Sequence, residues 1–435
     1  MIPKLYPVGE NGSLRVCGTD RFKAGMLSVS SVMPITPENA CLAPLLLSVL
    51  RRGTEKYPTL ADVNRRLDYL WGTSFSLRSY YRGNLMVVGF SADLLDSAYL
   101  PLGSEELLDG VLDMMQQMLF HPVLDADGLL SAKYVESEKE LQCDAIRSVK
   151  NNPRAYAAER CKSILFENDP CGISQYGSEE QTMAVTREEL TAFWRAWIAD
   201  LHPDCFYVGP ADPTYLQHKL EAVFSCAAPL GRLARESGLV ALHEARNIRK
   251  NETLPVSQSQ LIVCMRSKTR INDEDAAAFT VLNEILGASP ISRLFMQLRE
   301  KQSLCYSCSS AYHSYAGTVM IFCGIKAENR ERAEREIFRQ LQQLGKGKLR
   351  DEELEAAKKS LEGVYRRLED SPEALESFYY GRALMHNGSS IEDCRAAVCR
   401  VSAEEVARAA RALETDVVYF LEGTLAGGDC DYEED

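Results

Sequence analysis

The helices and strands predicted from this sequence occur in the same order twice along the chain. Each copy reads as a strand, two helices, two alternating strands, an amphipathic helix and a long helix broken near its middle. The breaks are Asn151, Asn152 and Pro153 in the first copy, and Asp370, Ser371 and Pro372 in the second. A unit of about 200 residues repeated in this way predicts two homologous α+β domains rather than one large fold.

Both copies also end in the same way, with a capping box, the helix that it starts and then a strand. The capping pairs are Thr186 with Glu189 and Ser402 with Glu405. A charged stretch without sustained periodicity separates the copies. The predicted organisation is an N-terminal domain at residues 1–230, a linker at 231–253, a C-terminal domain at 254–425 and a disordered acidic tail at 426–435.

Charge and hydropathy exclude several classes of partner. The net charge of −13 and the lack of a basic block argue against a nucleic-acid partner and against an anionic membrane surface. No signal peptide is evident, and the apolar runs are far too short to span a bilayer, so we expect a cytoplasmic protein. The fourteen cysteines are scattered through apolar patterns, which is typical of reduced core residues rather than of a disulfide framework.

Residues 282–310 are the most informative stretch of the chain. They predict a helix that Gly287 ends as a left-handed C-cap, then a turn, a second helix, and a strand over residues 304–312. In a regular strand, Cys305 and Cys308 would point to opposite faces. That geometry disfavours a redox or zinc site at this C-x-x-C sequence.

This stretch resembles the C-terminal half of family M16, the inverted zinc peptidases that include pitrilysin, insulinase and the mitochondrial processing peptidase. The family phrase reads approximately L-G-G-s-x-x-S-R-L-f-x-x-l-R-e-k-x-g-L-x-Y, a match over about two dozen ordered positions. The positions in register are Gly287, Ser292, Arg293, Leu294, Arg299, Glu300, Lys301, Leu304 and Tyr306. By this resemblance, Arg299 and Tyr306 are the polar pair of a peptide-binding cleft. The resemblance also implies the LuxS/MPP-like fold, in which two mostly antiparallel sheets flanked by helices face each other as a clamshell.

The zinc motif of the family is degenerate in this chain. Catalytic members carry His-x-x-Glu-His on the first helix of the first half, where the histidines bind zinc and the glutamate activates water. The helix predicted at residues 37–53 has Pro44, Leu47 and Ser48 in their place, and the third ligand position falls on Ala145. The resemblance therefore implies no cofactor here, with zinc only in a catalytic partner.

These observations support three hypotheses. The leading one is a non-catalytic M16 subunit that binds peptide and pairs with an active zinc M16 peptidase, in which case the chain alone is not an enzyme. The second is a freestanding peptide-binding or scaffold protein that self-associates as a dimer. The third is an active zinc peptidase with unorthodox ligands, for which His121, His202 and His313 would have to converge although they lack ligand spacing.

Overall fold

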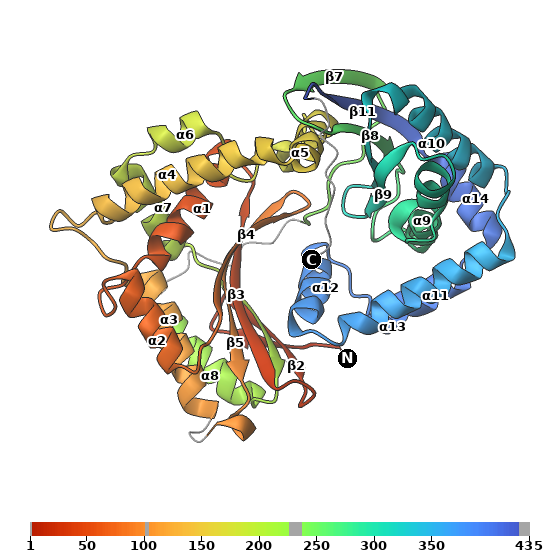
Figure 1. Ribbon diagram of the computed structural model, residues 1–435. Coiled ribbons are helices and arrows are strands. Elements are labelled where there is room, and N and C mark those ends of the chain that lie inside the picture. Colours follow the sequence, from red (N-terminus) through yellow and green to blue (C-terminus); the bar gives the residue numbers. More distant parts are fainter. Residues whose placement is uncertain (1, 101–103, 226–236, 426–435) are drawn as a thin grey trace, which may run out of the picture. The chain divides into compact units, whose positions relative to one another are not determined.

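A computed structural model describes residues 2–100, 104–225 and 237–425 of the chain (Figure 1). These residues form two compact units, each a mixed α+β layer structure with one sheet. The first unit runs to Ile146 and adds Ile173–Gly238 and Leu368–His386, and the second comprises Arg147–Gly172, Leu239–Arg367 and the chain from Asn387 onward. The predicted α+β class, with two sheets flanked by helices, is confirmed.

The first unit is built on a six-stranded sheet. All neighbouring strands pair antiparallel except β2 and β6, which are parallel. In order across the sheet, the strands are β1 (Lys4–Val8), β2 (Gly12–Gly18), β6 (Asp204–Gly209), β3 (Ala24–Pro34), β5 (Leu85–Leu95) and β4 (Phe75–Arg82). The strand and the pair of alternating strands predicted for the first copy are present as β3 and the β4–β5 hairpin, whereas the β1–β2 hairpin was not predicted.

Helix α1 (Pro37–Arg51) lies in the interior of this unit. Its start follows the sequence signals, because the Thr36 hydroxyl accepts a 3.0 Å hydrogen bond from the Asn39 amide and Pro37 occupies the first turn. From Ala40 to Leu50, every side chain of α1 except Ser48 is buried, since the helix packs against β4, β5 and neighbouring helices. The other α-helices of the first unit are α2 (Leu60–Tyr69), α3 (Ser104–Phe120), α4 (Ala132–Ser148), α6 (Glu179–Ala184), α7 (Arg187–Ala199), α8 (Pro213–Phe224) and α12 (Pro372–Leu384).

The second unit has a five-stranded sheet with the same kind of pairing. Only β7 and β11 are parallel. In order across the sheet, the strands are β7 (Ile248–Leu254), β11 (Glu414–Gly423), β8 (Ser259–Arg266), β10 (Thr318–Ile325) and β9 (Cys305–His313). Its helices are α5 (Pro153–Leu165), α9 (Ala276–Asn283), α10 (Arg330–Gly345), α11 (Asp351–Leu368), α13 (Ile391–Arg400) and α14 (Ala403–Ala412). Strand β9, which contains Tyr306 at the end of the family phrase, is at the edge of the described sheet.

Each unit takes one helix from the other half of the sequence. Helix α5, from the first half, packs on β8 and β11 of the second unit, and α12, from the second half, packs on β3 and β6 of the first. Near each of the two predicted helix breaks, the chain passes from one unit to the other. There Asn152 and Ser371 cap the exchanged helices by accepting hydrogen bonds from the amides of Ala155 (3.1 Å) and Ala374 (3.2 Å).

Charged contacts hold the two exchanged helices on their sheets. Arg246 and Arg266 donate hydrogen bonds to the last carbonyl oxygens of α5, and both guanidinium groups pair with the buried Asp416. On α12, Glu376 accepts two hydrogen bonds from Arg78, at 2.6 and 2.8 Å, and its side chain is 2% exposed. A buried carboxylate is stable only when its oxygens are paired in this manner.

Several boundaries differ from the predictions. The expected linker at 231–253 includes most of β7, because residues 248–254 pair in parallel with β11. The part of the linker at 231–236 and the expected acidic tail at 426–435 lie outside the described residues. Helix α4 begins at Ala132, after a turn in which Gly128 has a φ of +75°. Within the described chain, no helix is both long and apolar enough to cross a membrane.

The role predicted for Gly287 was wrong. Its φ is not in the left-handed region, and it lies inside a π-helical turn, Glu284–Ala288, that continues α9. A Cβ on Gly287 would lie 2.7 Å from the Ser310 hydroxyl and 2.8 Å from its amide nitrogen. Glycine is therefore needed here because the helix approaches β9 closely, not because the helix ends.

Candidate functional site

The positions of the degenerate zinc motif are filled with packed side chains. Pro44 is buried in α1, Leu47 is 1% exposed and Ser48 is half-buried. The Ala145 side chain is exposed on α4. None of these four side chains offers a nitrogen, thiolate or carboxylate ligand, so the residues present do not fit the zinc ion of the family.

Helix α4 contacts α1 and the residue that follows it through buried polar side chains that form hydrogen bonds within the protein. Glu138 accepts a hydrogen bond from Arg52, and the Gln142 amide donates to the Cys41 carbonyl oxygen at 3.1 Å. Both Glu138 and Gln142 are buried. These contacts stabilise the packing of the two helices.

The hypothesis of unorthodox zinc ligands requires several ligand side chains to lie close together, and the part of the chain that the structure describes contains no such group. There, no group of three or more His, Cys, Asp or Glu side chains could hold a metal ion. His121 lies 3.7 Å from Glu55, whereas His202 lies 3.2 Å from Asp200. His313 is on β9, in the second unit.

Arg299 is an exposed side chain on a firmly anchored element. It belongs to a π-helical turn, Phe295–Lys301, in which Leu298 is completely buried, as is Leu294 directly before the turn. Its guanidinium lies 5.0 Å from the centre of the Phe295 ring and 3.8 Å from the Glu300 carboxylate. The Arg299 side chain is 49% exposed, so its N–H donors remain accessible to a ligand.

Tyr306 is the extra residue of a β-bulge. Ser307 pairs with Gly324 and Cys305 with Ile325, which leaves Tyr306 without a residue opposite it on β10. The bulge turns Tyr306 outward, where it is 53% exposed, and brings both Cys305 and Cys308 into the hydrophobic core. The predicted placement of the two cysteines on opposite faces was therefore wrong.

The thiols beneath Tyr306 are nevertheless poor nucleophiles. The Sγ atoms of Cys308 and Cys323 are 2.9 Å apart. A hydrogen bond with Cys308, together with burial, raises the pKa of Cys305, and the nearby Arg299 charge opposes this only in part. For Cys308, the hydrogen bond with Cys305 lowers the pKa, but the one with Cys323 and burial raise it well above its usual value. Because the thiolate is the reactive form, these buried groups are suited to packing.

Arg299 and Tyr306 thus lie on two elements that pack against each other. Strand β9 pairs with β10 on one side only among the described strands, so its other edge presents backbone groups. An arginine, a phenol and an open strand edge can bind an extended peptide.

Another polar residue of the phrase, Arg293, is turned into the protein. Its guanidinium donates to the Glu353 carboxylate at 2.8 Å and to the Lys348 carbonyl oxygen. Arg293 is 9% exposed. Its part in the phrase is to anchor the helical turn that carries Arg299.

Comparison with known proteins gives consistent matches. Residues 184–361 match the family model described as the peptidase M16 inactive domain. A Bacillus subtilis protein named "Probable inactive metalloprotease YmfF" is 27% identical over 410 residues, which cover 93% of this chain and 94% of that protein. "Uncharacterized zinc protease YmxG" from the same species is 24% identical over 60% of this chain and 61% of that protein.

Solved structures match over nearly the whole chain. The crystal structure of a conserved protein from Enterococcus faecalis has a TM-score of 0.88 at 25% identity, covering 98% of this chain and 99% of that one. A peptidase M16 inactive domain from Pseudomonas fluorescens has a TM-score of 0.79 at 18% identity, covering 98% and 100%. The described fold is therefore one that these proteins share.

Proposed function

We propose that this chain, which belongs to the M16 peptidase family as an inactive metalloprotease-like homologue, binds a peptide beside Arg299 and Tyr306 and pairs with a zinc-containing M16 peptidase. The names of its relatives are consistent with an inactive and an active member of such a pair, since one is called an inactive metalloprotease and another a zinc protease. In the proposed pair, the partner supplies the zinc-activated water, and this cytoplasmic chain supplies part of the peptide site.

The observation that carries the proposal is the contrast between the two sets of family positions. Pro44 and Leu47 are buried among apolar side chains, whereas Arg299 and Tyr306 are about half exposed on well-anchored elements. Exposed polar side chains of this kind contribute little to folding stability. Their presence is better accounted for by binding than by packing.

A peptide bound in extended form would match this surface. Its backbone could pair with the open edge of β9, while the Arg299 guanidinium donates hydrogen bonds to a peptide carbonyl oxygen. The Tyr306 hydroxyl can both donate and accept, so it could contact either an amide or a carbonyl group of the same peptide. Because backbone groups supply most of this recognition, we expect broad peptide specificity.

The test begins with a tagged copy of the chain recovered from its native cytoplasm. We expect a second chain of similar length that contains His-x-x-Glu-His to co-purify in near-equal amount, and zinc to be found in that chain. Recovery of the tagged chain alone or only with its own copies would contradict the pairing and favour the freestanding scaffold. Zinc bound in stoichiometric amount to this chain alone, with hydrolysis that a chelator stops, would overturn the non-catalytic assignment.

Substitutions in the purified pair then test the two side chains. Arg299→Ala combined with Tyr306→Phe should lower kcat/KM of the pair by about tenfold or more, which corresponds to about 1.4 kcal/mol of lost transition-state binding. Arg335→Ala is the matched control, because Arg335 is 71% exposed and forms an exposed ion pair with Glu331, 3.6 Å away on the same helix. Unchanged activity of the double variant, with assembly intact, would remove both residues from the site.

A further inference from the structure

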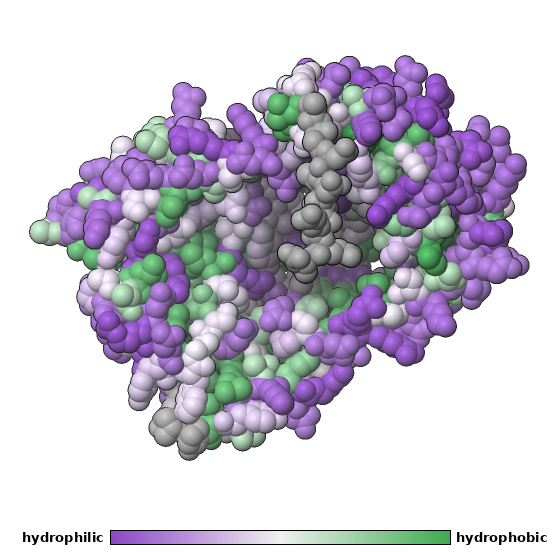
Figure 2. Space-filling view, in the orientation of Figure 1, coloured by the Kyte–Doolittle hydropathy of each residue, from purple (hydrophilic) through white to green (hydrophobic). Residues whose placement is uncertain are grey.

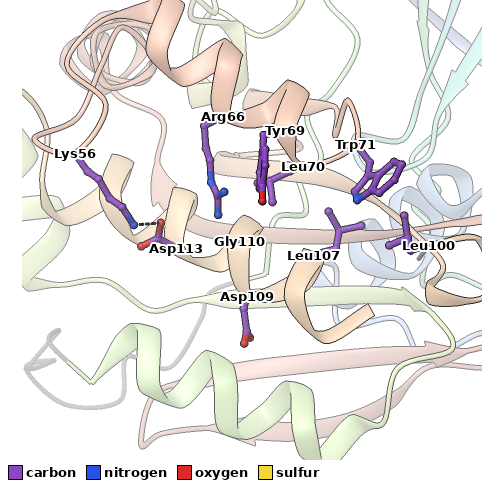
Figure 3. A pocket seen from close by; sticks show the side chains of 10 residues that line it. All are labelled: Lys56, Arg66, Tyr69, Leu70, Trp71, Leu100, Leu107, Asp109, Gly110 and Asp113. Atoms are coloured by element: carbon purple, nitrogen blue, oxygen red, sulfur yellow. Dashed lines mark hydrogen bonds and ion pairs between the residues drawn. The ribbon is translucent and has the colours of Figure 1, made fainter. Parts of the chain in front are cut away.

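The first unit contains a cavity of about 440 Å³ between α2 and α3, which the proposed function does not use (Figure 3). This volume is within the range of small-molecule binding sites, about 300–1,000 Å³. Its walls combine aromatic, aliphatic and charged side chains. The lining residues are Lys56, Arg66, Tyr69, Leu70, Trp71, Leu100, Leu107, Asp109, Gly110 and Asp113.

Helical spacing explains how α2 and α3 form this cavity. Arg66, Tyr69 and Leu70 follow one another at i, i+3 and i+4, so they share the face of α2 that is turned toward α3 (Figure 3). On α3 the facing residue is Gly110, where a Cβ would lie only 2.4 Å from a Leu70 methyl group and 3.1 Å from the Arg66 guanidinium. The glycine allows the two helices to approach and leaves the guanidinium at the cavity wall.

Trp71 is held at the cavity by an unusual backbone. Its φ is +62°, a conformation that bulky residues rarely adopt, and Gly72 follows with a φ of +70°. The turn is fixed by hydrogen bonds, because the Gly72 amide donates to the Leu67 carbonyl and the Thr73 hydroxyl donates to the Leu70 carbonyl. The result is an indole that is 51% exposed, although packing inside the unit would bury it more favourably.

The visible surface of the molecule is mostly hydrophilic (Figure 2), so exposed aromatic rings around one cavity are a distinct feature. Tyr69 is 73% exposed and lies on the same wall as Trp71. Such rings can stack on an apolar or aromatic group of a ligand.

One charge of this cavity is left without a counter-ion. Lys56 pairs with Asp113 at 2.7 Å, and Asp109 pairs with Lys219 at 2.8 Å. Hydrogen bonding to these carboxylates raises the pKa of both lysines, so each lysine keeps its charge beside its carboxylate partner. Within the described residues, Arg66 has no carboxylate partner. Its guanidinium lies 5.3 Å from the centre of the Tyr69 ring, and its buried Nε has no hydrogen-bond acceptor.

We propose that this cavity binds a carboxylate carried on an aromatic or large apolar side chain, with the carboxylate on Arg66 and the apolar group between Trp71 and Leu107. Guanidinium is the side chain best suited to a planar carboxylate. This chemistry has two sources, namely the C-terminal residue of a peptide and a free amino acid such as phenylalanine. The site is independent of the peptide surface at Arg299.

Tryptophan fluorescence offers a direct readout of binding. The chain has three tryptophans, and both Trp194 and Trp197 are 8% exposed and donate hydrogen bonds within the protein. A ligand in the cavity should therefore change the emission of Trp71 alone, and the change should disappear in Trp71→Phe. The probes are N-acetyl-phenylalanine, its uncharged amide, Gly-Gly-Phe and free phenylalanine, titrated into the full chain.

We expect N-acetyl-phenylalanine to bind at least about tenfold more tightly than its uncharged amide, and Arg66→Met to abolish that preference. Arg65→Met is the matched control, because Arg65 is on the same helix but 76% exposed and paired with Asp62. A thermal unfolding curve for each variant confirms that it is folded. Equal binding of acid and amide, an unchanged preference in Arg66→Met, or no saturable signal up to about 1 mM ligand would overturn the proposal.

The remaining two probes identify the source of the ligand. If Gly-Gly-Phe binds as tightly as N-acetyl-phenylalanine, the site accepts a peptide C-terminus. If free phenylalanine binds more tightly than both, its ammonium group is recognised as well, and the site is one for an amino acid. Either result supports the carboxylate site.

Discussion

Arg293 and Glu353 form a charge pair that ties together two helical segments of the second unit. The Arg293 side chain is 10% exposed and that of Glu353 is 22% exposed, so solvent screens their interaction only in part. Burial by itself raises the pKa of Glu353. Hydrogen bonds from Arg293 and from the backbone and side chain of Arg350 outweigh it and lower that pKa from 4.5 to about 2.

This shift predicts a dependence of stability on pH. Because the pKa of Glu353 is lower in the folded state, its contribution is fully present above pH 4.5 and is lost as the pH falls toward about 2. At pH 7, Glu353→Gln should lower the free energy of unfolding by about 1–2 kcal/mol after solvent screening, and this difference should shrink below pH 4.5. Urea unfolding at several pH values measures it. The neighbouring exposed Glu352→Gln should show no comparable difference, and a gap that stays constant with pH would contradict the assignment.

At the scale of single elements, two glycines in the second unit should respond to the same substitution with opposite sign. Gly287→Ala places a methyl group against the backbone of Ser310, so we expect a loss of about 1–3 kcal/mol in the free energy of unfolding. Gly363 is in the middle of α11, where an added Cβ meets only the flexible end of Arg367 at 3.5 Å. Gly363→Ala should therefore gain about 0.5–1 kcal/mol, because alanine favours the helix.

Denaturant unfolding of both variants measures these effects side by side. A stabilised Gly287→Ala protein would mean that α9 and β9 are not in the close contact described. A destabilised Gly363→Ala protein would mean that the exposed face of α11 is packed against something else.

At the scale of the whole molecule, the exchanged helices make each unit depend on both halves of the sequence. Glu376 is the buried anchor of α12, since it accepts hydrogen bonds from Arg78 and from Ser28. Removing one partner of a buried ion pair leaves the other charge uncompensated. The stability of the first unit should therefore be sensitive to a substitution of Glu376, which is 348 residues from Ser28 in the sequence.

We expect Glu376→Gln to destabilise the first unit by about 3 kcal/mol. Amide hydrogen exchange should rise in α12 and in the strands β3 and β6 beneath it, because local opening exposes these elements together. Glu373→Gln is the control on the same helix, where an exposed carboxylate should matter by less than about 0.5 kcal/mol. Faster exchange confined to α12, with the strands unchanged, would show that the helix is only loosely attached.

Local signals in the sequence determined most of the elements. The caps Thr186 and Ser402 start helices as predicted, and the residues before Pro153 and Pro372 break them, because these effects act within one turn of the backbone. The loss of the zinc motif at Pro44, Leu47 and Ser48 could also be predicted from the sequence, since the ability to bind zinc depends on residue type.

Only the tertiary structure decided which side chains meet. The sequence did not reveal that Tyr306 is a bulge, that Gly287 lies against Ser310, or that Arg66 is left without a counter-ion among the described residues. It marked both helix breaks but not the exchange of α5 and α12. Each of these features depends on contacts between segments far apart in the chain, and the periodicity and capping of one segment carry no information about the partner that will cover it.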